Sequence, residues 1–297
     1  MPKEKITEVL KKGRVLLSDG AWGTLLYNKG LKEGECPELW NITHYNDVKD
    51  IALGYINVGS DMVMTNSLGG NRFVLAHYSL EDRVVEINEA AARASREAAG
   101  DNKWVIASVG PTGKMLVMGE ITKEEIYEGY KEQIVALEKG GADAVCIETM
   151  SDLDEALLAI KAAKENTSLE VITTFTFNKT RQGEYRTMMG VTPKESAIAC
   201  VNAGADIVGT NCGNGIEQMI GIVMEIRGAV PNTPILVQSN AGLPINEDGR
   251  IVYIESPEYM AQYVKPIVAA GANIVGGCCG TTPEHIRAMR KVLDELQ

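Results

Sequence analysis

A nine-residue phrase occurs four times in this chain and constrains its fold more than any other feature. The copies are GSDMVMTNS from Gly59, GADAVCIET from Gly141, GADIVGTNC from Gly204 and GANIVGGCC from Gly271. Each copy begins with a glycine that can end a helix, continues with a small residue and Asp or Asn, and then becomes apolar. The intervals of 82, 63 and 67 residues leave room for a helix, a strand and a second helix between copies.

The segments before and between the copies supply four more apolar runs: RVLLSDG from Arg14, KWVIASVG from Lys103, LEVITTFTF from Leu169 and TPILVQSN from Thr233. Runs that are apolar throughout are typical of parallel strands buried on both faces. Residues 123–139 and 283–293 have apolar side chains at helical spacing, which predicts amphipathic helices. Eight strands alternating with helices predict a single-domain (β/α)8 TIM barrel over residues 1–297. A doubly wound open sheet is the alternative, but no Gly-x-Gly-x-x-Gly follows the first strand.

Charge and the amino terminus exclude several classes of protein. The 297 residues carry a net charge of −11, which argues against a nucleic-acid partner, because phosphate backbones require a basic surface. The first residues, MPKEKITEVL, lack the apolar core of a signal peptide, and no stretch approaches the ~18 apolar residues of a membrane span. We therefore expect a cytoplasmic protein without a membrane partner, and six cysteines that stay reduced.

Polar residues gather where the predicted strands end, which is where TIM barrels carry their chemistry. In strand order these residues are Asp19, Thr65 and Asn66, Ser108, Glu148, Thr174 and Thr176, Asn211 and Cys212, Ser239 and Asn240, and Cys278 and Cys279. The other cysteines are expected elsewhere, with Cys36 in a loop, Cys146 inside a strand and Cys200 in a helix. Three of the six cysteines therefore share one rim.

The three rim cysteines form a candidate metal site. The sixth and eighth strands of a barrel are next-but-one neighbours, so Cys212 can approach Cys278 and Cys279. Three converging thiolates without a fourth protein ligand are typical of a catalytic zinc site that leaves one position open. Packing alone, or a redox pair, remains the alternative reading of these cysteines.

Two adjacent cysteines can bind one ion only if the backbone bends between them. Gly276, Gly277 and Gly280 are expected to supply that freedom. Thr282 as a cap and Pro283 as the first helical residue predict a helix start beside the pair, and the positive end of a helix favours thiolate over thiol.

Other catalytic chemistries lack the residues they need. His44, His77 and His285 are the histidines of the chain and none lies at a predicted strand end, which disfavours Ser-His-Asp and Cys-His mechanisms. Asp19 and Glu148 could act as an acid and base pair, cap the following helices, or hold a substrate ammonium group. Beside three thiolates, we favour the ammonium role.

With these residues in place, the chain resembles the homocysteine S-methyltransferase family, which includes betaine–homocysteine methyltransferases and the N-terminal domain of cobalamin-dependent methionine synthase. The motifs DGAWGT, TNSLGGNR, GPTG, the Glu of CIET, GTNCGNG and GGCCGTTPEHI follow the family's order, from about residue 12 to residue 292. The resemblance implies a zinc-dependent, homocysteine-binding (β/α)8 barrel domain.

The resemblance also implies roles for individual residues. Cys212, Cys278 and Cys279 would hold zinc, whose open position takes the homocysteine sulfur. Asp19, Gly20 and Glu148 would surround the amino-acid end of homocysteine. The rim residues Asn66 and Ser108 complete the candidate substrate-binding set.

The methyl donor is left open between two kinds of molecule. Animal-type betaine enzymes place aromatic rings against a quaternary ammonium, but the corresponding segment here is Leu68–Gly70. Trp22 and Trp40 are the possible substitutes. The incomplete cage favours a methylated corrinoid, such as methylcobalamin, carried by a partner protein, over small onium donors such as betaine or S-methylmethionine. Methyl transfer to another thiol, or a non-catalytic zinc–thiolate module that binds thiols or senses redox state, is the alternative function.

Overall fold

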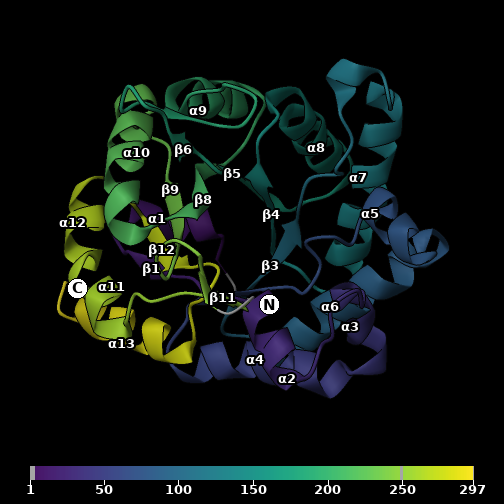
Figure 1. Ribbon diagram of the computed structural model, residues 1–297, viewed down its shortest axis with the longest axis horizontal. Helices are drawn as coiled ribbons and strands as arrows, with labels where there is room; N and C mark the ends of the chain where they lie inside the picture. Colours follow the sequence, from purple (N-terminus) through teal and green to yellow (C-terminus); the bar gives the residue numbers. More distant parts are fainter. Residues whose placement is uncertain (1–3, 248–249, 297) are drawn as a thin grey trace.

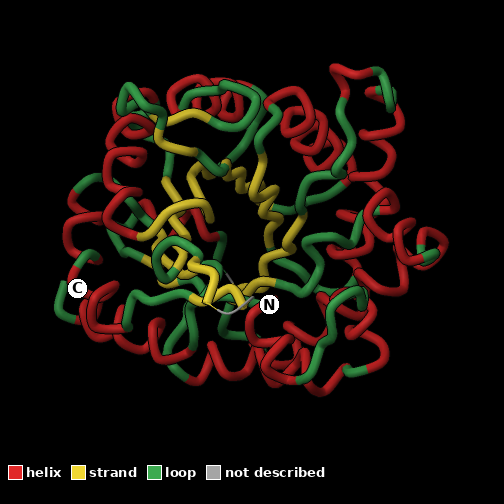
Figure 2. Tube along the Cα trace, in the orientation of Figure 1, coloured by secondary structure: helices red, strands yellow, loops and turns green. Residues whose placement is uncertain are grey.

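The computed structural model describes residues 4–247 and 250–296, and within them one sheet of eight parallel strands forms the centre of the molecule. The strands are β1 (Leu16–Leu17), β2 (Met62–Met64), β3 (Trp104–Val109), β4 (Ala144–Met150), β5 (Glu170–Phe175), β8 (Ile207–Gly215), β9 (Ile235–Asn240) and β12 (Ile274–Gly277). Their order is β1-β12-β9-β8-β5-β4-β3-β2, and the sheet curls into a ring (Figure 2). Each strand begins within one of the eight apolar runs, and β4 and β8 extend past the ends of theirs, so the predicted barrel is confirmed and the open sheet is excluded.

Helices surround the ring (Figure 1). They are α1 (Ile6–Lys11), α2 (Gly23–Lys29), α3 (Trp40–Thr43), α4 (Tyr45–Asn57), α5 (Arg72–Leu75), α6 (Val84–Ala99), α7 (Lys123–Lys139), α8 (Leu153–Asn166), α9 (Pro193–Asn202), α10 (Ile216–Ala229), α11 (Pro257–Gln262), α12 (Val264–Ala269) and α13 (Pro283–Asp294). The predicted helices at 123–139 and 283–293 correspond to α7 and α13. In the part of the chain that the structure describes, every helix is too short or too polar to cross a bilayer.

Short elements decorate the loops between strands and helices. They are the 3-10 turns η1 (Pro37–Leu39), η2 (Ala76–Tyr78), η3 (Glu81–Arg83) and η4 (Leu116–Met118), and the hairpins β6 (Asn178–Lys179) with β7 (Tyr185–Arg186) and β10 (Ile245–Glu247) with β11 (Arg250–Val252). Both hairpins follow the carboxyl ends of barrel strands, β5 and β9, so they stand at the same end of the barrel.

Helix α1 closes the amino-terminal end of the barrel. Its Ile6 and Leu10 pack with the apolar side chains that fill the interior, among them Met62 and Ile172. The carboxylate of Glu170, at the start of β5, accepts the backbone N–H of Ile6 at 2.6 Å and that of Thr7 at 3.0 Å. Because α1 plugs this end, a ligand that enters the barrel among the described residues must do so at the carboxyl-terminal mouth.

The Asp or Asn of each repeated phrase joins its strand to the strand before it in sequence. Asp143 shows the pattern: its N–H donates to the Val105 carbonyl at 2.8 Å, and its carboxylate accepts the Val105 N–H at 2.8 Å. The corresponding pairs are Asp61 with Leu17, Asp206 with Val171 and Asn273 with Ile235. These two hydrogen bonds, which we call the clamp, therefore join each of β2, β4, β8 and β12 to the barrel strand that precedes it.

A basic residue from a neighbouring helix completes each clamp. Arg96 contacts Asp143, Lys164 lies 3.0 Å from Asp206, Arg227 donates to Asn273 at 2.8 Å, and Asp61 takes both Arg14 (2.7 Å) and Arg290 (3.1 Å). The Asp61 clamp has a further consequence. It joins β1 to β2, the two ends of the strand order, and so closes the ring.

Candidate active site

Three cysteines converge at the carboxyl-terminal mouth of the barrel. The Cys212 sulfur lies 3.9 Å from that of Cys279, the Cys278 sulfur lies 4.0 Å from that of Cys279, and all three sulfur atoms lie within 4.8 Å of one another. Hydrogen bonds from Cys212 and Cys278 lower the pKa of the Cys279 thiol, and the contacts of Cys278 with Cys212 and Cys279 raise the pKa of the Cys278 thiol. The contacts between the three sulfur atoms therefore favour one thiolate, at Cys279.

Two different backbone devices bring these sulfur atoms together. In β8 the register shifts between Asn211 and Gly215, and Cys212 takes a left-handed φ of 59°. In the other segment β12 ends at Gly277, and the chain turns through Cys278 and Cys279 so that the Thr281 N–H returns to the Cys278 carbonyl at 3.1 Å. The bend that the adjacent pair requires is a turn beyond the strand.

The three flanking glycines were predicted to supply backbone freedom, which is correct for Gly280 and wrong for Gly276 and Gly277. Gly280 has a φ of +79°, a conformation that favours glycine. Gly276 and Gly277 are strand residues without positive φ; they are needed for space. A Cβ at Gly276 would come 2.8 Å from the Cβ of Ser18, and one at Gly277 would collide with the side chain of Thr281.

The remaining cysteines and the histidines lie outside this cluster. Cys36 is buried in the loop before η1, Cys146 in β4 and Cys200 in α9, as expected. His44 stacks on Trp40 at 4.0 Å, and His285 lies in α13 with its Nε2 2.9 Å from the Glu255 carbonyl. None of these groups joins the three-cysteine cluster among the residues that the structure describes.

A cavity of about 260 Å³ extends from the cysteines across the mouth. Its lining includes Gly20, Trp22, Asn66, Leu68, Ser108, Glu148, Gln238, Cys212, Cys278 and Cys279. Among the described residues that line it there is no Lys or Arg. The cavity therefore joins negatively charged groups without a protein cation to balance them.

Glu38 and Glu148 are the carboxylates among the described residues of the cavity wall, and Glu38 already accepts the Gly69 N–H at 2.8 Å. Ser108 donates its hydroxyl to Glu148 Oε1, and the Asn211 amide donates to Glu148 Oε2 at 3.3 Å. Burial, with smaller contributions from the nearby Asp19 and Cys212, raises the pKa of Glu148 to about 7. A carboxylate held this way, without a cationic partner, is suited to an ammonium group.

Asp19 lies beneath the cavity wall rather than on it. Its carboxylate accepts the Met64 N–H at 2.8 Å, the Trp22 indole N–H at 2.9 Å and the Ser18 hydroxyl at 3.1 Å. Burial raises its pKa to about 6 despite these donors. Asp19 does not cap α2, which begins at Gly23 without a side-chain cap. It instead orients Trp22 and adds negative charge behind the cavity.

Gly20 and Asn66 are placed at the cavity with different surroundings. A Cβ at Gly20 would come 2.6 Å from the Thr281 hydroxyl, so the backbone passes very close to the loop that carries the paired cysteines. The Asn66 amide nitrogen donates to the Pro37 carbonyl at 2.8 Å and to Asn41 at 3.0 Å. Asn66 therefore anchors the loop that forms one wall, and its contact with substrate stays a prediction.

The cysteine cluster fits the zinc ion that the family resemblance implies. With Zn–S bonds of about 2.3 Å, tetrahedral zinc holds its sulfur ligands about 3.8 Å apart. The observed separations of 3.9 and 4.0 Å agree with that spacing. Cys212, Cys278 and Cys279 would be its protein ligands.

Several residues at the site were not assigned a role from the sequence. Asn211 and Thr149, each at an irregularity of its strand, β8 and β4, bond to each other. Gln238 lines the cavity, and the ring of Tyr253 packs over Gly280 beside Cys279. Asn211 and Thr149 are next to Cys212 and Glu148 in the repeated phrase, so the sequence indicated that they lie at the site. No sequence pattern indicated that Gln238 or Tyr253 would lie at the site.

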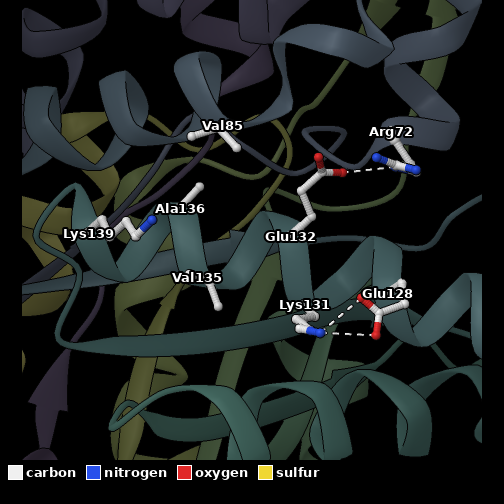
Figure 3. Close-up of a pocket in the computed structure, with 8 residues that line it drawn as sticks. All are labelled: Arg72, Val85, Glu128, Lys131, Glu132, Val135, Ala136 and Lys139. Atoms are coloured by element: carbon white, nitrogen blue, oxygen red, sulfur yellow. Dashed lines mark hydrogen bonds and ion pairs between the residues drawn. The ribbon is translucent and has the colours of Figure 1, made fainter.

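A second concave surface, of about 320 Å³, lies on the outside of the barrel against α5, α6 and α7 (Figure 3). Four of its five charged side chains pair with one another, Arg72 with Glu132 at 2.9 Å and Lys131 with Glu128 at 3.0 Å, and the fifth is Lys139. Largely neutralised in this way and remote from the strand ends, this surface does not gather a cluster of catalytic groups.

A closed barrel whose mouth gathers three cysteines and a buried carboxylate defines a (β/α)8 barrel protein with a candidate thiolate metal centre. The chain belongs to the homocysteine S-methyltransferase family, whose model matches residues 16–293. The resemblance inferred from the motifs is confirmed.

Two relatives are methionine synthases from mycobacteria. The chain is 30% identical over 294 residues to that of Mycobacterium leprae, a match covering 92% of this chain and 24% of the relative. It is 29% identical over 299 residues to that of Mycobacterium tuberculosis, covering 96% of this chain and 25% of the relative. The chain thus spans about a quarter of the length of these relatives.

Solved structures share the fold. The metallated homocysteine methyltransferase MmuM from Escherichia coli has a TM-score of 0.78 at 22% identity, over 96% of this chain and 98% of that one. A methyltransferase from Methanosarcina mazei has a TM-score of 0.64 at 10% identity, over 98% of this chain and 97% of that one. These likenesses establish the barrel architecture.

Proposed function

We propose that this protein transfers a methyl group to the sulfur of homocysteine, giving methionine, with zinc held by Cys212, Cys278 and Cys279. The observation that carries the proposal is the convergence of three sulfur atoms beside a cavity that Glu148 lines and in which no Lys or Arg stands among the described lining residues. The names of the mycobacterial relatives and of the E. coli structure support homocysteine as the acceptor.

Zinc bound by three thiolates supplies a Lewis acid with one open position that favours the thiolate form of the substrate thiol. The chain itself positions the rest of the molecule. Glu148 accepts the substrate ammonium, Ser108 and Asn211 hold Glu148 in place, and Asp19 adds charge from beneath. Fixing both ends of the amino acid aligns the sulfur for in-line attack on a methyl group, which can contribute much of the rate.

A methylated corrinoid on a partner protein is the proposed donor. An onium donor would need an aromatic cage, and Trp22 is the aromatic side chain among the described cavity-lining residues. Trp40 is 5% exposed and stacks on His44, so it is part of the packing. Leu68 occupies the remaining wall. One ring favours a donor that is held outside the cavity.

The mouth is also suited to a large donor. A cavity of about 260 Å³ holds an amino acid but not a corrinoid, so such a donor must approach over the rim. The loops after β3 and β5 present Val117, Met118 and Met188, which are 71%, 68% and 82% exposed. These side chains stand at the same end of the barrel as the cavity, and apolar side chains exposed in this way are typical of a docking surface.

The test is to load the protein with zinc, supply homocysteine, and offer methylcobalamin, betaine, S-methylmethionine and methyltetrahydrofolate in parallel. We expect methionine with methylcobalamin at rates above those with the small onium donors. If methionine forms with betaine or S-methylmethionine but not with methylcobalamin, the proposed donor is wrong. Zinc binding without methionine from any donor would refute the enzyme and favour a thiol-binding module.

A further inference from the structure

Two residues at the site hold a backbone conformation that their side chains disfavour. Thr149, directly after Glu148, has a φ of +62°, and Cys212 has a φ of +59°. Each lies where its strand loses register, between Ile147 and Met150 in β4 and between Asn211 and Gly215 in β8. Such conformations cost about 1–3 kcal/mol each and persist only where the surroundings enforce them.

The Asn211 side chain joins these two strained segments. Its Oδ1 accepts the Thr149 N–H and the Thr174 hydroxyl, both at 2.8 Å, and its Nδ2 donates to Thr149 Oγ1 at 2.7 Å and to Glu148 Oε2 at 3.3 Å. The amide is fully buried and uses its whole capacity of two donors and two acceptors. A side chain so completely bonded has one position.

The Asn211 backbone is fixed as well. Its carbonyl accepts the Thr176 hydroxyl at 2.9 Å, and the next residue in the chain is Cys212. Side chain and backbone together therefore link the carboxylate of Glu148, on β4, to the sulfur of Cys212, on β8, across the intervening strand β5.

We propose that Asn211 is a positioning residue that couples the Glu148 carboxylate to the Cys212 thiolate, so that the amino-group and sulfur ends of the substrate site are set together. The inference rests on the proposed function, since it assumes that one substrate spans both ends. Coupling of this kind is reciprocal: a change at the carboxylate alters the thiolate cluster, and a change at the cluster alters the carboxylate.

The test compares Asn211→Asp with Asn214→Asp. The first substitution keeps the shape and the acceptor for Thr149 but replaces the donor to Glu148 with an oxygen. Asn214 lies on the same strand and is also buried, and its side chain donates to the Phe177 carbonyl at 2.6 Å rather than to Glu148 or Thr149. Asn214→Asp therefore measures the effect of replacing a buried Asn by Asp on this strand where no link to Glu148 is lost.

Both variants and the unmodified protein are loaded with cobalt(II), and the thiolate-to-cobalt absorption is titrated with homocysteine; KM and kcat are measured on the zinc forms. We expect the Asn211→Asp midpoint and its KM to rise about tenfold, the loss of one hydrogen bond to a charged group. Asn214→Asp should stay within about twofold, the scatter of a substitution that touches neither end. Equal midpoints in the two variants would overturn the coupling.

Thr174→Val is the second variant, in case Asn211→Asp does not fold. It removes one hydroxyl bond to Asn211 while conserving volume, and we expect a shift of about threefold in the same direction. No shift relative to the unmodified protein would overturn the proposal. Unmodified protein that binds no cobalt through thiolates, or does not respond to homocysteine, would refute the proposed function and the coupling with it. If the unmodified protein responds to homocysteine but the variants have the same titration midpoint as their controls, the coupling is refuted and the proposed function is not.

Discussion

At the amino end of the barrel, the Asp or Asn of each repeated phrase makes the same pair of hydrogen bonds to the preceding strand. At the carboxyl end, the last two positions of the same phrase differ in every copy: Asn66 and Ser67, Glu148 and Thr149, Asn211 and Cys212, Cys278 and Cys279. The end that repeats is the one that holds the strands together. The end that varies is the one that surrounds the cavity.

This contrast explains how one local sequence can serve stability and chemistry at once. The clamp needs only a backbone N–H and a side-chain acceptor, so the phrase can be reused without change. The mouth needs different groups on different strands, since a substrate presents a different atom to each. Substitutions at the clamp end should therefore lower the free energy of unfolding, whereas substitutions at the mouth should impair substrate binding and turnover.

The largest effect is expected at the mouth. Cys278→Ala should abolish stoichiometric zinc and lower methionine formation by more than the roughly 100-fold that a supporting residue around a metal typically contributes. The thermal midpoint should change by only a few degrees. Metal analysis, turnover and thermal unfolding on one preparation check this; full activity with normal zinc content would refute the metal-site assignment.

At the clamp end, Asp61→Ala should cost about 3 kcal/mol of unfolding free energy, because it leaves Arg290 without its buried partner and removes the bonds that join β1 to β2. Protein that remains folded should bind zinc normally. Urea unfolding monitored by circular dichroism gives the free energy. Unchanged stability would show that Asp61 does not close the ring.

Replacing an acid by its amide at the mouth should spare the fold and impair binding. Glu148→Gln removes the charge that pairs with the ammonium group, a bond of about 1.5–3 kcal/mol, so kcat/KM for homocysteine should fall about 10- to 100-fold. Stability should not decrease, because the variant no longer buries a carboxylate. A normal KM would place the ammonium elsewhere.

The same residue should set a pH dependence. Since burial raises the pKa of Glu148 to about 7, protonation below that pH leaves a neutral carboxyl that cannot pair with ammonium. In the unmodified protein kcat/KM should therefore fall as the pH drops below about 7. Glu148→Gln should lack this inflection and retain the one from the substrate thiol. An inflection that persists in the variant belongs to another group.

The smallest effect is expected for Asp206→Asn. The amide oxygen can still accept the Val171 N–H, as Asn273 does for Ile235, and the lost partner is a half-exposed Lys164. Pairs of this kind are worth up to about 1 kcal/mol. A larger loss in chemical unfolding would show that the clamps depend on charge rather than on hydrogen bonding.

The strands and the composition of the mouth could be predicted because both follow from the order of residues along the chain. Apolar runs locate the strands, and parallel strands put their last residues on one rim. That reasoning correctly placed Cys212 near Cys278 and Cys279. The closure of the ring by Asp61 was not predictable, because the phrase does not show which backbone groups its Asp reaches.

The departures from prediction arise where the backbone leaves regular geometry. A strand pattern does not reveal that Thr149 and Cys212 take left-handed conformations, since neither is a residue that favours them. It suggested backbone freedom for Gly276 and Gly277, whereas the structure requires them for close packing. It also placed Asp19 on the rim, although hydrogen bonds from Met64 and Trp22 hold its carboxylate beneath the cavity.

X-ray absorption at the zinc edge, recorded with and without homocysteine, tests most directly whether the three cysteines hold a metal that accepts the substrate sulfur. We predict three sulfur neighbours at about 2.3 Å in the free protein and four when homocysteine is bound. A shell that contains fewer than three sulfur atoms, or that does not change on adding homocysteine, would contradict the account.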